Sequence, residues 1–132
     1  MSNGLPIGQW GVVERTVTDD FTAASLGLPG VDVLATPVLV GFVERASGQL
    51  IFPYLAAGEA TVGTHIDLSH LAATPVGMKV TIRSQLAAVE GRKLTFKFEA
   101  FDEVEKVAEG THTRVIVNLQ RILEKARAKK RG

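Results

Sequence analysis

The most constraining feature of this sequence is the apolar stretch over residues 33–55, VLATPVLVGFVERASGQLIFPYL. At helical spacing its apolar side chains leave little of the circumference polar, and a helix that is apolar nearly all round is a buried one. Thr36 and Pro37 mark its start, because threonine can cap the first turn and proline suits the first helical position. Pro53 marks its end. The sequence therefore predicts a central helix that the rest of the chain must cover.

After this helix the apolar pattern changes from a period of about 3.6 to a period of 2, which indicates β-strands. In the first strand after the helix, the even-numbered residues 60–68 are predicted on one face and the odd-numbered residues 59–67 on the other. His70 is expected in the loop that follows it. The strands are expected over residues 59–68, 79–86, 94–100 and 107–119, with an earlier one within residues 7–17, turns at Glu90-Gly91 and Asp102-Glu103, and a short helix from about Asn118.

One helix with a set of antiparallel strands indicates an α+β fold. A single helix that is apolar all round needs more cover than one flat sheet provides. A strongly curved sheet around the helix, or a second subunit, would supply that cover. The pattern predicts a hot-dog fold, in which a curved antiparallel sheet wraps a long central helix. It also predicts a dimer, because an open sheet has an exposed edge. At 132 residues the chain is expected to form one domain over residues 1–132.

Composition narrows the possible functions. The chain contains no cysteine, which excludes disulfides, thiolate metal sites and a cysteine nucleophile. No run approaches the roughly 18 apolar residues that span a bilayer. The first ten residues lack the basic and apolar segments of a signal peptide. We therefore expect a cytoplasmic protein without a membrane partner.

The C-terminus is basic, with five bases and no acid in residues 125–131, whereas the preceding 124 residues hold ten bases and 14 acids. Such a tail could be a nucleic-acid arm. No aromatic residue is interleaved with these bases to stack on nucleotides. We therefore interpret residues of about 121–132 as a solvated helix or tail and expect no nucleic-acid partner.

Three polar residues are candidates for chemistry: Thr36 at the helix start, Glu44 within the helix and His70 after the second strand. Thr36 and Glu44 are eight residues apart, so about 12 Å of helix separates them and they would flank a site. Gly41 shares a helix face with Glu44 and would leave room for a substrate beside the carboxylate.

Each candidate also has a purely structural interpretation. Thr36 could be only a helix cap, Glu44 could pair with a base, and His70 could be an exposed loop histidine. His65 and His112 are interpreted as structural. The three histidines do not form a recognisable metal motif, so no metal is expected. No GxSxG elbow, P-loop or dinucleotide fingerprint is present either.

At these residues the chain resembles the hot-dog fold thioesterases, and within them the fluoroacetyl-CoA thioesterase-like group. The resemblance implies a homodimer, or a dimer of dimers, that hydrolyses an acyl-CoA thioester with the acyl pocket at the subunit interface. The resemblance also implies that the reaction needs no cofactor, because coenzyme A is part of the substrate. The matching strings are ATPVLVGFVERA at 35–46, GEATVGTHIDLSHLAATPVGMKVT at 58–81, VEGRKL at 89–94 and EGTHTRVIV at 109–117.

The polar site of that group consists of a threonine or serine near the helix start, a glutamate on the helix and a histidine after the second strand. The resemblance implies these roles for Thr36, Glu44 and His70, and a pocket-lining role for Gly63. Fluoroacetyl-specific members carry aromatic side chains in the segment before the helix. The aligned positions in this chain are Gly27 and Gly30, so the selective lid is not retained.

The chemistry fits these residue types. Glu44 could activate water as a general base or attack the carbonyl itself, and His70 could polarise the carbonyl or carry the proton to the leaving thiolate. Thr36 could donate a hydrogen bond, and a backbone N–H near the helix start or at Gly63 could complete an oxyanion site. Arg83, Arg92, Lys93, Arg114 and the tail are candidate contacts for the CoA phosphates. Two alternatives stay open: a hydratase or dehydratase on the same fold, and a non-catalytic acyl-CoA-binding module.

Overall fold

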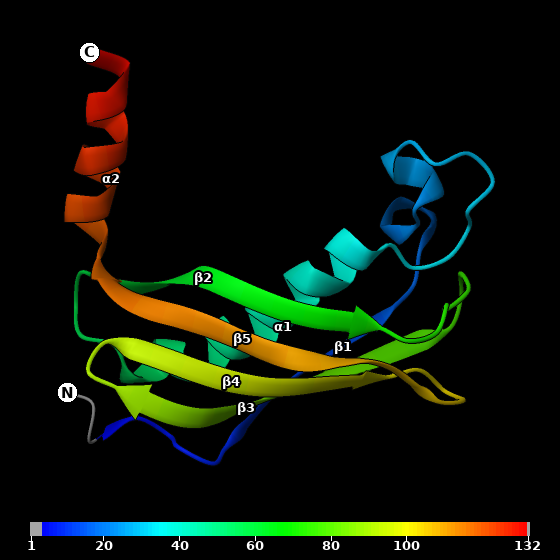
Figure 1. Cartoon of the computed structure of the whole chain (residues 1–132), viewed down its shortest axis with the longest axis horizontal. Coiled ribbons are helices and arrows are strands. Elements are labelled where there is room, and N and C mark those ends of the chain that lie inside the picture. The colour runs from blue at the N-terminus through cyan, green and yellow to red at the C-terminus, as the bar shows by residue number, and fades with distance from the viewer. Residues whose placement is uncertain (1–3, 132) are drawn as a thin grey trace.

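The computed structural model describes residues 4–131, so residues 1–3 and 132 of the predicted domain lie outside the described range. Its elements follow the predicted order (Figure 1). The short 3-10 turns η2 (Asp19–Phe21) and η3 (Ala24–Leu26) form part of a lobe, defined here as residues 18–34, and η4 (Phe52–Tyr54) follows the central helix. The main elements are β1 (Trp10–Thr16), α1 (Thr36–Ile51), β2 (Glu59–His70), β3 (Lys79–Glu90), β4 (Lys93–Phe101), β5 (Lys106–Asn118) and α2 (Leu119–Ala128).

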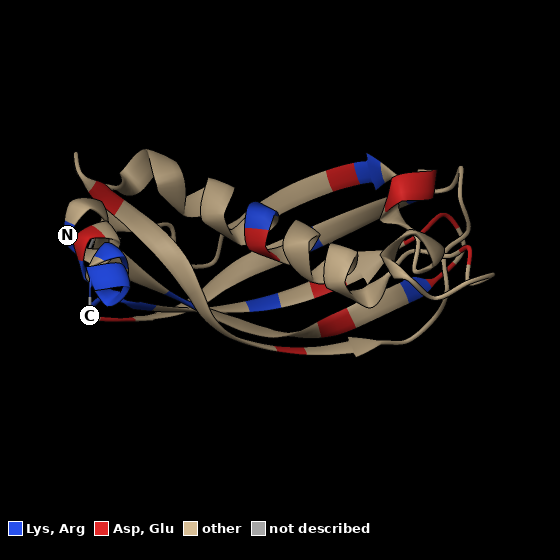
Figure 2. Cartoon of the chain, turned by 90° about the horizontal axis from the view of Figure 1, so that it is seen from above, with Lys and Arg blue, Asp and Glu red and all other residues tan. Residues whose placement is uncertain are grey.

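The five strands form one antiparallel sheet in the order β1-β3-β4-β5-β2. The sheet curls around α1, which crosses one of its faces, as the two perpendicular views show (Figures 1 and 2). The predicted architecture of a curved antiparallel sheet around a central helix is confirmed. β1 and β2 are the two edge strands, and β2 presents a twelve-residue edge.

One face of α1 forms the core with the inner side of the sheet. Its buried residues are Leu39, Phe42, Val43, Ala46, Ser47 and Ile51. At Gly11 of β1, a side chain would run into the carbonyl oxygen of Ala46, so glycine is needed for this close approach. Within one chain, Gly41, Glu44 and Arg45 lie on an exposed face of α1, so the sheet alone does not supply the all-round cover that the apolar pattern predicts. Apolar residues lie on both sides of the helical wheel, so the sequence does not show which side is exposed. Within one chain, the sheet buries only the side of α1 that faces it.

A β-bulge interrupts β2 and changes the predicted faces of the strand. Gly63 pairs with Arg114 and His65 pairs with Thr113, so Thr64 is left out of the ladder. Gly63 faces α1, and after the bulge Ile66 packs against the core as well. The simple even–odd assignment over residues 59–68 is therefore wrong, because the extra residue shifts the alternation by one.

The end of β2 also differs from the prediction. His70 is the last residue of the strand, paired with Ala108, and is not in a loop. The turns at Glu90-Gly91 and Asp102-Glu103 are confirmed between β3 and β4 and between β4 and β5. In the second turn the Asp102 carboxylate accepts hydrogen bonds from the backbone N–H groups of Val104 and Glu105, which fixes the turn.

The predicted C-terminal helix is present as α2, which projects from the end of β5 away from the sheet (Figure 1). The Asn118 side chain caps it by accepting a hydrogen bond from the Arg121 N–H, and the Leu119 N–H donates to the Gly58 carbonyl. None of the residues of α2 is buried. Within residues 4–131, the helices are too short or too polar to cross a bilayer.

Candidate functional site

Thr36 and His70 form the first part of the site. The start of α1 brings the threonine to the end of β2, where its Oγ1 lies 2.7 Å from Nδ1 of His70. Thr36 does not cap the helix: the N-cap residue is Ala35, and the Thr36 hydroxyl is turned to the imidazole instead. The interpretation of Thr36 as only a helix cap is therefore wrong.

The second nitrogen of the His70 ring lacks a partner. Nε2 is buried and makes no hydrogen bond of normal geometry to the residues that the structure describes. Burial lowers the pKa of His70, and a backbone contact with Ala72 opposes this shift. The ring therefore favours its neutral form, with Nδ1 held by Thr36 and Nε2 buried without a hydrogen bond of normal geometry. A cavity of about 340 Å³ opens beside the pair, lined by Val33, Thr36, His70, Leu71, Ala72 and Ala73.

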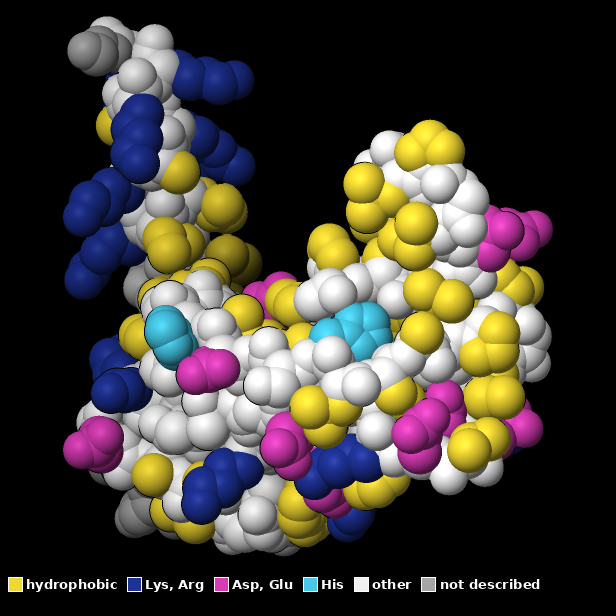
Figure 3. All heavy atoms as spheres, turned by 45° about the vertical axis from the view of Figure 1, so that its right-hand side comes forward, with side chains coloured by type: hydrophobic (Ala, Val, Ile, Leu, Met, Phe, Trp, Pro, Cys, Tyr) yellow, Lys and Arg dark blue, Asp and Glu magenta, His cyan; other side chains and the backbone are white. Residues whose placement is uncertain are grey.

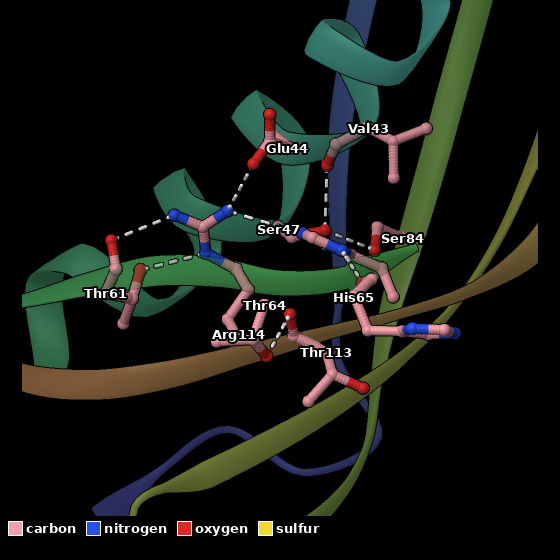
Figure 4. A network of polar contacts seen from close by, with 10 residues as sticks. Val43, Glu44, Ser47, Thr61, Thr64, His65, Ser84, Thr113 and Arg114 are labelled. Atoms are coloured by element: carbon pink, nitrogen blue, oxygen red, sulfur yellow. Dashed lines mark hydrogen bonds and ion pairs between the residues drawn. The ribbon is translucent and has the colours of Figure 1, made fainter. Parts of the chain in front are cut away.

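Glu44 forms the second part of the site, together with Arg114 of β5 (Figure 4). Nη1 of Arg114 lies 3.5 Å from Oε2 of Glu44, and the carboxylate is 46% exposed whereas the guanidinium side chain is only 10% exposed. Thr61 fixes the guanidinium, since its hydroxyl accepts from Nε at 3.0 Å and its carbonyl accepts from Nη2 at 2.9 Å. Glu44 thus faces an immobilised cation and keeps one side open to solvent.

Gly63 and His112 complete the surroundings of Glu44. A Cβ at Gly63 would lie 2.5 Å from Oε2 of Glu44, so only glycine leaves the carboxylate in this position. His112 is buried, and its Nδ1 donates to the His65 carbonyl at 2.8 Å. Its Nε2 therefore accepts from Nη1 of Arg114, at 3.3 Å. Burial lowers the pKa of His112, and the nearby guanidinium acts in the same direction.

The two parts of the site are separate within one chain. Thr36 and Glu44 both belong to α1, and eight residues correspond to roughly 12 Å along the axis. Gly41 lies between them on the exposed face, and a Cβ there would meet open space. The structure thus joins Thr36 to His70 and Glu44 to Gly63, but not one pair to the other. A cavity of about 300 Å³ beside Glu44 is lined by Val40, Glu44, Gly63, Thr64, His65, Ile66 and His112.

Sequence reasoning missed the relation of Arg114 to Glu44 and considered this arginine only as a phosphate contact. The alternation of buried residues at 112, 114 and 116 along β5 was the available signal, because it places an arginine on the inner face. Two other candidate phosphate contacts are engaged elsewhere: Arg83 pairs with Glu99, and Arg92 pairs with Glu59. No group of three or more His, Asp or Glu side chains within residues 4–131 is placed to hold a metal ion.

The glycines of the lobe have a conformational role. Gly27 has φ of 99° and Gly30 has φ of 83°, in the region that residues with a side chain rarely adopt. Neither position has another atom within 4 Å of an added Cβ. The backbone of this lobe therefore requires glycine at these positions, and an aromatic lid residue would be strained at either one.

Comparison with known proteins gives a consistent result. The model of the family described as fluoroacetyl-CoA-specific thioesterase (FlK) matches residues 17–120. A fluoroacetyl-CoA thioesterase from Streptantibioticus cattleyicolor is 41% identical over 98 residues, which cover 74% of this chain and 70% of the relative.

Solved structures show the same fold. A structure of the fluoroacetyl-CoA thioesterase FlK superposes with a TM-score of 0.89 at 35% identity, covering 96% of this chain and 98% of that one. A Thermus thermophilus hypothetical protein described as a thioesterase superfamily member gives a TM-score of 0.89 at 29% identity, with 96% and 94% covered. A hot-dog-like protein from Thermanaerovibrio acidaminovorans gives 0.88 at 22% identity, with 99% and 96% covered, which shows the likeness of fold alone.

Proposed function

The chain belongs to the fluoroacetyl-CoA-specific thioesterase family, and we propose that it is an acyl-CoA thioesterase whose catalytic residues are Thr36, Glu44 and His70. The reaction splits an acyl-CoA into a free acid and coenzyme A. Water is the co-reactant, so the reaction requires no resident cofactor. The observation that carries the site assignment is the 2.7 Å contact between Thr36 and His70, which leaves the buried Nε2 of His70 without a partner.

His70 acts on the thioester through Nε2. When the Thr36 hydroxyl donates to Nδ1, the neutral ring carries its proton on Nε2. That N–H can donate to the thioester carbonyl oxygen, where negative charge develops, or pass its proton to the leaving thiolate. The lowered pKa of His70 keeps the ring neutral near pH 7, which is the state that this arrangement requires.

Glu44 acts either on the attacking water or directly on the thioester carbonyl carbon. Its exposed side allows it to take a proton from water as a general base, or to attack the carbonyl as a nucleophile. Arg114 stabilises the carboxylate charge at 3.5 Å and limits its movement. Gly63 and Gly41 serve as substrate-binding positions, because a side chain at Gly63 would displace the carboxylate and Gly41 borders open space beside it.

A homodimer provides the way to bring the two parts of the site together. β2 is an edge strand with twelve residues available for pairing. Antiparallel pairing of two β2 strands places the first half of one beside the second half of the other. The Glu44–Gly63 pair of one protomer then approaches the Thr36–His70 pair of its partner, which shortens the separation of roughly 12 Å that one helix imposes.

The identity of the acyl group is a separate question from the reaction type. The S. cattleyicolor relative is a fluoroacetyl-CoA thioesterase, but the positive φ of Gly27 and Gly30 argues against aromatic lid residues at these positions in this chain. We therefore expect acyl groups other than fluoroacetyl among the substrates.

Thiol release from a panel of short, long and aryl acyl-CoAs tests the function. Wild type should cleave at least one member, and Glu44→Ala and His70→Ala should each lose about 10²-fold or more of that rate while keeping the wild-type melting temperature. Glu90→Ala, which removes an exposed carboxylate at the β3–β4 turn, is the matched control and should retain full rate. Cleavage that is indifferent to both site variants would refute the site.

Two further measurements separate the alternatives. Binding of acyl-CoA without any thiol release across the panel would indicate a binding module, and loss of the conjugated double bond of an enoyl-CoA would indicate a hydratase. Single turnover in ¹⁸O-labelled water detects a covalent acyl-glutamate anhydride when water attacks its glutamyl carbonyl, because general-base hydrolysis places solvent oxygen in the acid product and never in Glu44. Trapping of the anhydride with hydroxylamine detects the same route when water attacks the acyl carbonyl instead.

A further inference from the structure

We infer that α2 of one protomer docks on the outer surface of its partner at the C-terminal end of β2, beside the wall of the partner's Thr36–His70 cavity. The inference rests on the homodimer proposed above. It assigns the C-terminal helix a function as a clamp between subunits. The docking surface is defined as the exposed residues Asp67, Ser69, Leu71 and Glu109.

The helix has no cover within its own chain. It spans ten residues without a buried side chain, and Leu119 and Leu123 are 43% and 39% exposed. A helix of this length is marginal in water unless it packs against something. Its base is nevertheless fixed by the Asn118 cap and by the Leu119 N–H bond to the Gly58 carbonyl. The base of α2 is thus fixed, whereas the rest of the helix projects from the body of the chain without packing against it (Figure 3).

The register of the sheet places α2 at the correct position to meet a second copy. Asn118, which precedes α2, pairs with Glu59, the first residue of β2. In an antiparallel pair of β2 strands, the first residue of one strand lies beside the last residues of the other. Because β5 lies one strand in from the β2 edge, the base of α2 is about two strand spacings, roughly 10 Å, from the end of the partner strand, and the helix has to project across its own β2 to reach it. In Figure 1, α2 projects past the β2 edge, on the side where a second copy paired through β2 would lie.

The two surfaces match in chemistry. α2 and the turn η5 (Lys129–Arg131) that follows it contain six bases and one acid in residues 119–131. Arg121 and Lys125 have no ion pair with any residue in the described range. The docking surface offers the carboxylate of Asp67, which has no ion pair in the described range, and that of Glu109, which also pairs with Lys106 at 2.7 Å. Leu71 on the same surface is 53% exposed. In the docked state, Leu119 and Leu123 would make apolar contacts with Leu71 of the partner subunit. The bases of α2 would at the same time lie near carboxylates of opposite charge.

The location of the docking surface gives the clamp a functional consequence. Leu71 follows His70 directly and lines the cavity beside the Thr36–His70 pair. Its backbone N–H donates to the Val107 carbonyl, which continues the β2–β5 ladder by one bond. A helix seated on this residue would hold the cavity wall in place. Each protomer would in this way stabilise the catalytic pair of its partner.

The absence of native cysteine makes cross-linking a direct test. Chains carrying Leu123→Cys are mixed with chains carrying Leu71→Cys, allowed to exchange subunits and treated with a short bis-maleimide. We expect a covalent heterodimer on a denaturing gel. The control replaces Leu71→Cys by Val12→Cys, which is 55% exposed but lies on β1 at the opposite edge of the sheet, and should give no product.

The outcomes separate this inference from the proposed function. A protein that is dimeric by mass and active, yet gives no more product with Leu71→Cys than with Val12→Cys, overturns the docking of α2 and leaves the thioesterase intact. Cross-linking to Leu28→Cys of the lobe in place of Leu71→Cys overturns it as well. A monomeric mass overturns both the docking and the proposed dimer. Strong and salt-sensitive cross-linking to Leu71→Cys alone supports it.

Discussion

Gly63 and His70 lie on the same face of β2 although seven residues separate them. In an uninterrupted strand an odd separation places two side chains on opposite faces. Here Thr64 is left out of the pairing with β5, and the alternation shifts by one residue. The bulge thereby directs Gly63 toward Glu44 and His70 toward Thr36, both on the side of α1. One extra residue in a strand thus assembles the polar groups of the site.

Gly63→Ala should impair catalysis more than stability. The added Cβ would lie 2.5 Å from Oε2 of Glu44, and this half-exposed carboxylate can move away at little cost. A shift of about 1 Å in a catalytic group can lower the rate by about 10²-fold. We expect kcat to fall by roughly that factor with a melting temperature within a few degrees of wild type. Wild-type kcat in the folded variant would contradict the proposed position of Glu44.

Thr36→Val and Thr36→Ser should differ sharply. Valine has nearly the shape of threonine but lacks the hydroxyl that contacts Nδ1 of His70 at 2.7 Å, so the imidazole loses its orienting partner. We expect kcat to fall by about 10- to 100-fold in Thr36→Val. Thr36→Ser keeps the hydroxyl and should retain most of the rate. Equal rates for the two variants, measured by steady-state thiol release, would show that the hydroxyl has no part in catalysis.

Gly41→Ala should stabilise the fold and reveal whether the substrate approaches this position. Glycine within an exposed helix costs about 1 kcal/mol relative to alanine, and a Cβ at Gly41 meets nothing within 4 Å. Urea denaturation should therefore show a gain of roughly that size. If the acyl group lies beside Gly41, KM should rise in the same variant. A stabilised variant with unchanged kcat and KM would remove Gly41 from the substrate-binding surface.

Acidification should destabilise the protein through buried His112 and half-buried His70. Burial lowers the pKa of both His70 and His112 below the ordinary value of about 6.5. Above that pH neither the folded nor the unfolded chain protonates these rings, and their contribution to stability is fully present. Below it the unfolded chain binds protons that the folded chain does not bind, so the free energy of unfolding decreases as the pH falls toward the folded-state values.

Denaturant titrations at pH 7.5, 6.5 and 5.5 measure this dependence. His112→Asn, which keeps a donor for the His65 carbonyl and does not titrate, should flatten the decrease between the two lower pH values. A slope that survives His112→Asn would assign the pH dependence to other groups.

Much of the fold could be predicted because its signals are local. The change of period after residue 55 indicates strands, and Glu90-Gly91 indicates the turn between β3 and β4, where Gly91 adopts a positive φ of 62°. The exposed face of α1 could not be predicted in this way. Valines and glycines around Glu44 read as apolar on every side, and only the position of the sheet determines which of them are covered.

The site likewise has features with local signals and features that arise from long-range contacts. Neighbouring residues and short motifs were sufficient to predict the central helix, the succession of strands along the chain and the candidate residues Thr36, Glu44, Gly63 and His70. The tertiary structure alone decided that His70 ends β2, that Gly63 faces Glu44 and that Arg114 meets Glu44 across 70 residues. These relations arise from the pairing of β2 with β5 and from the bulge within it, and strand pairing is a long-range interaction that local periodicity does not encode.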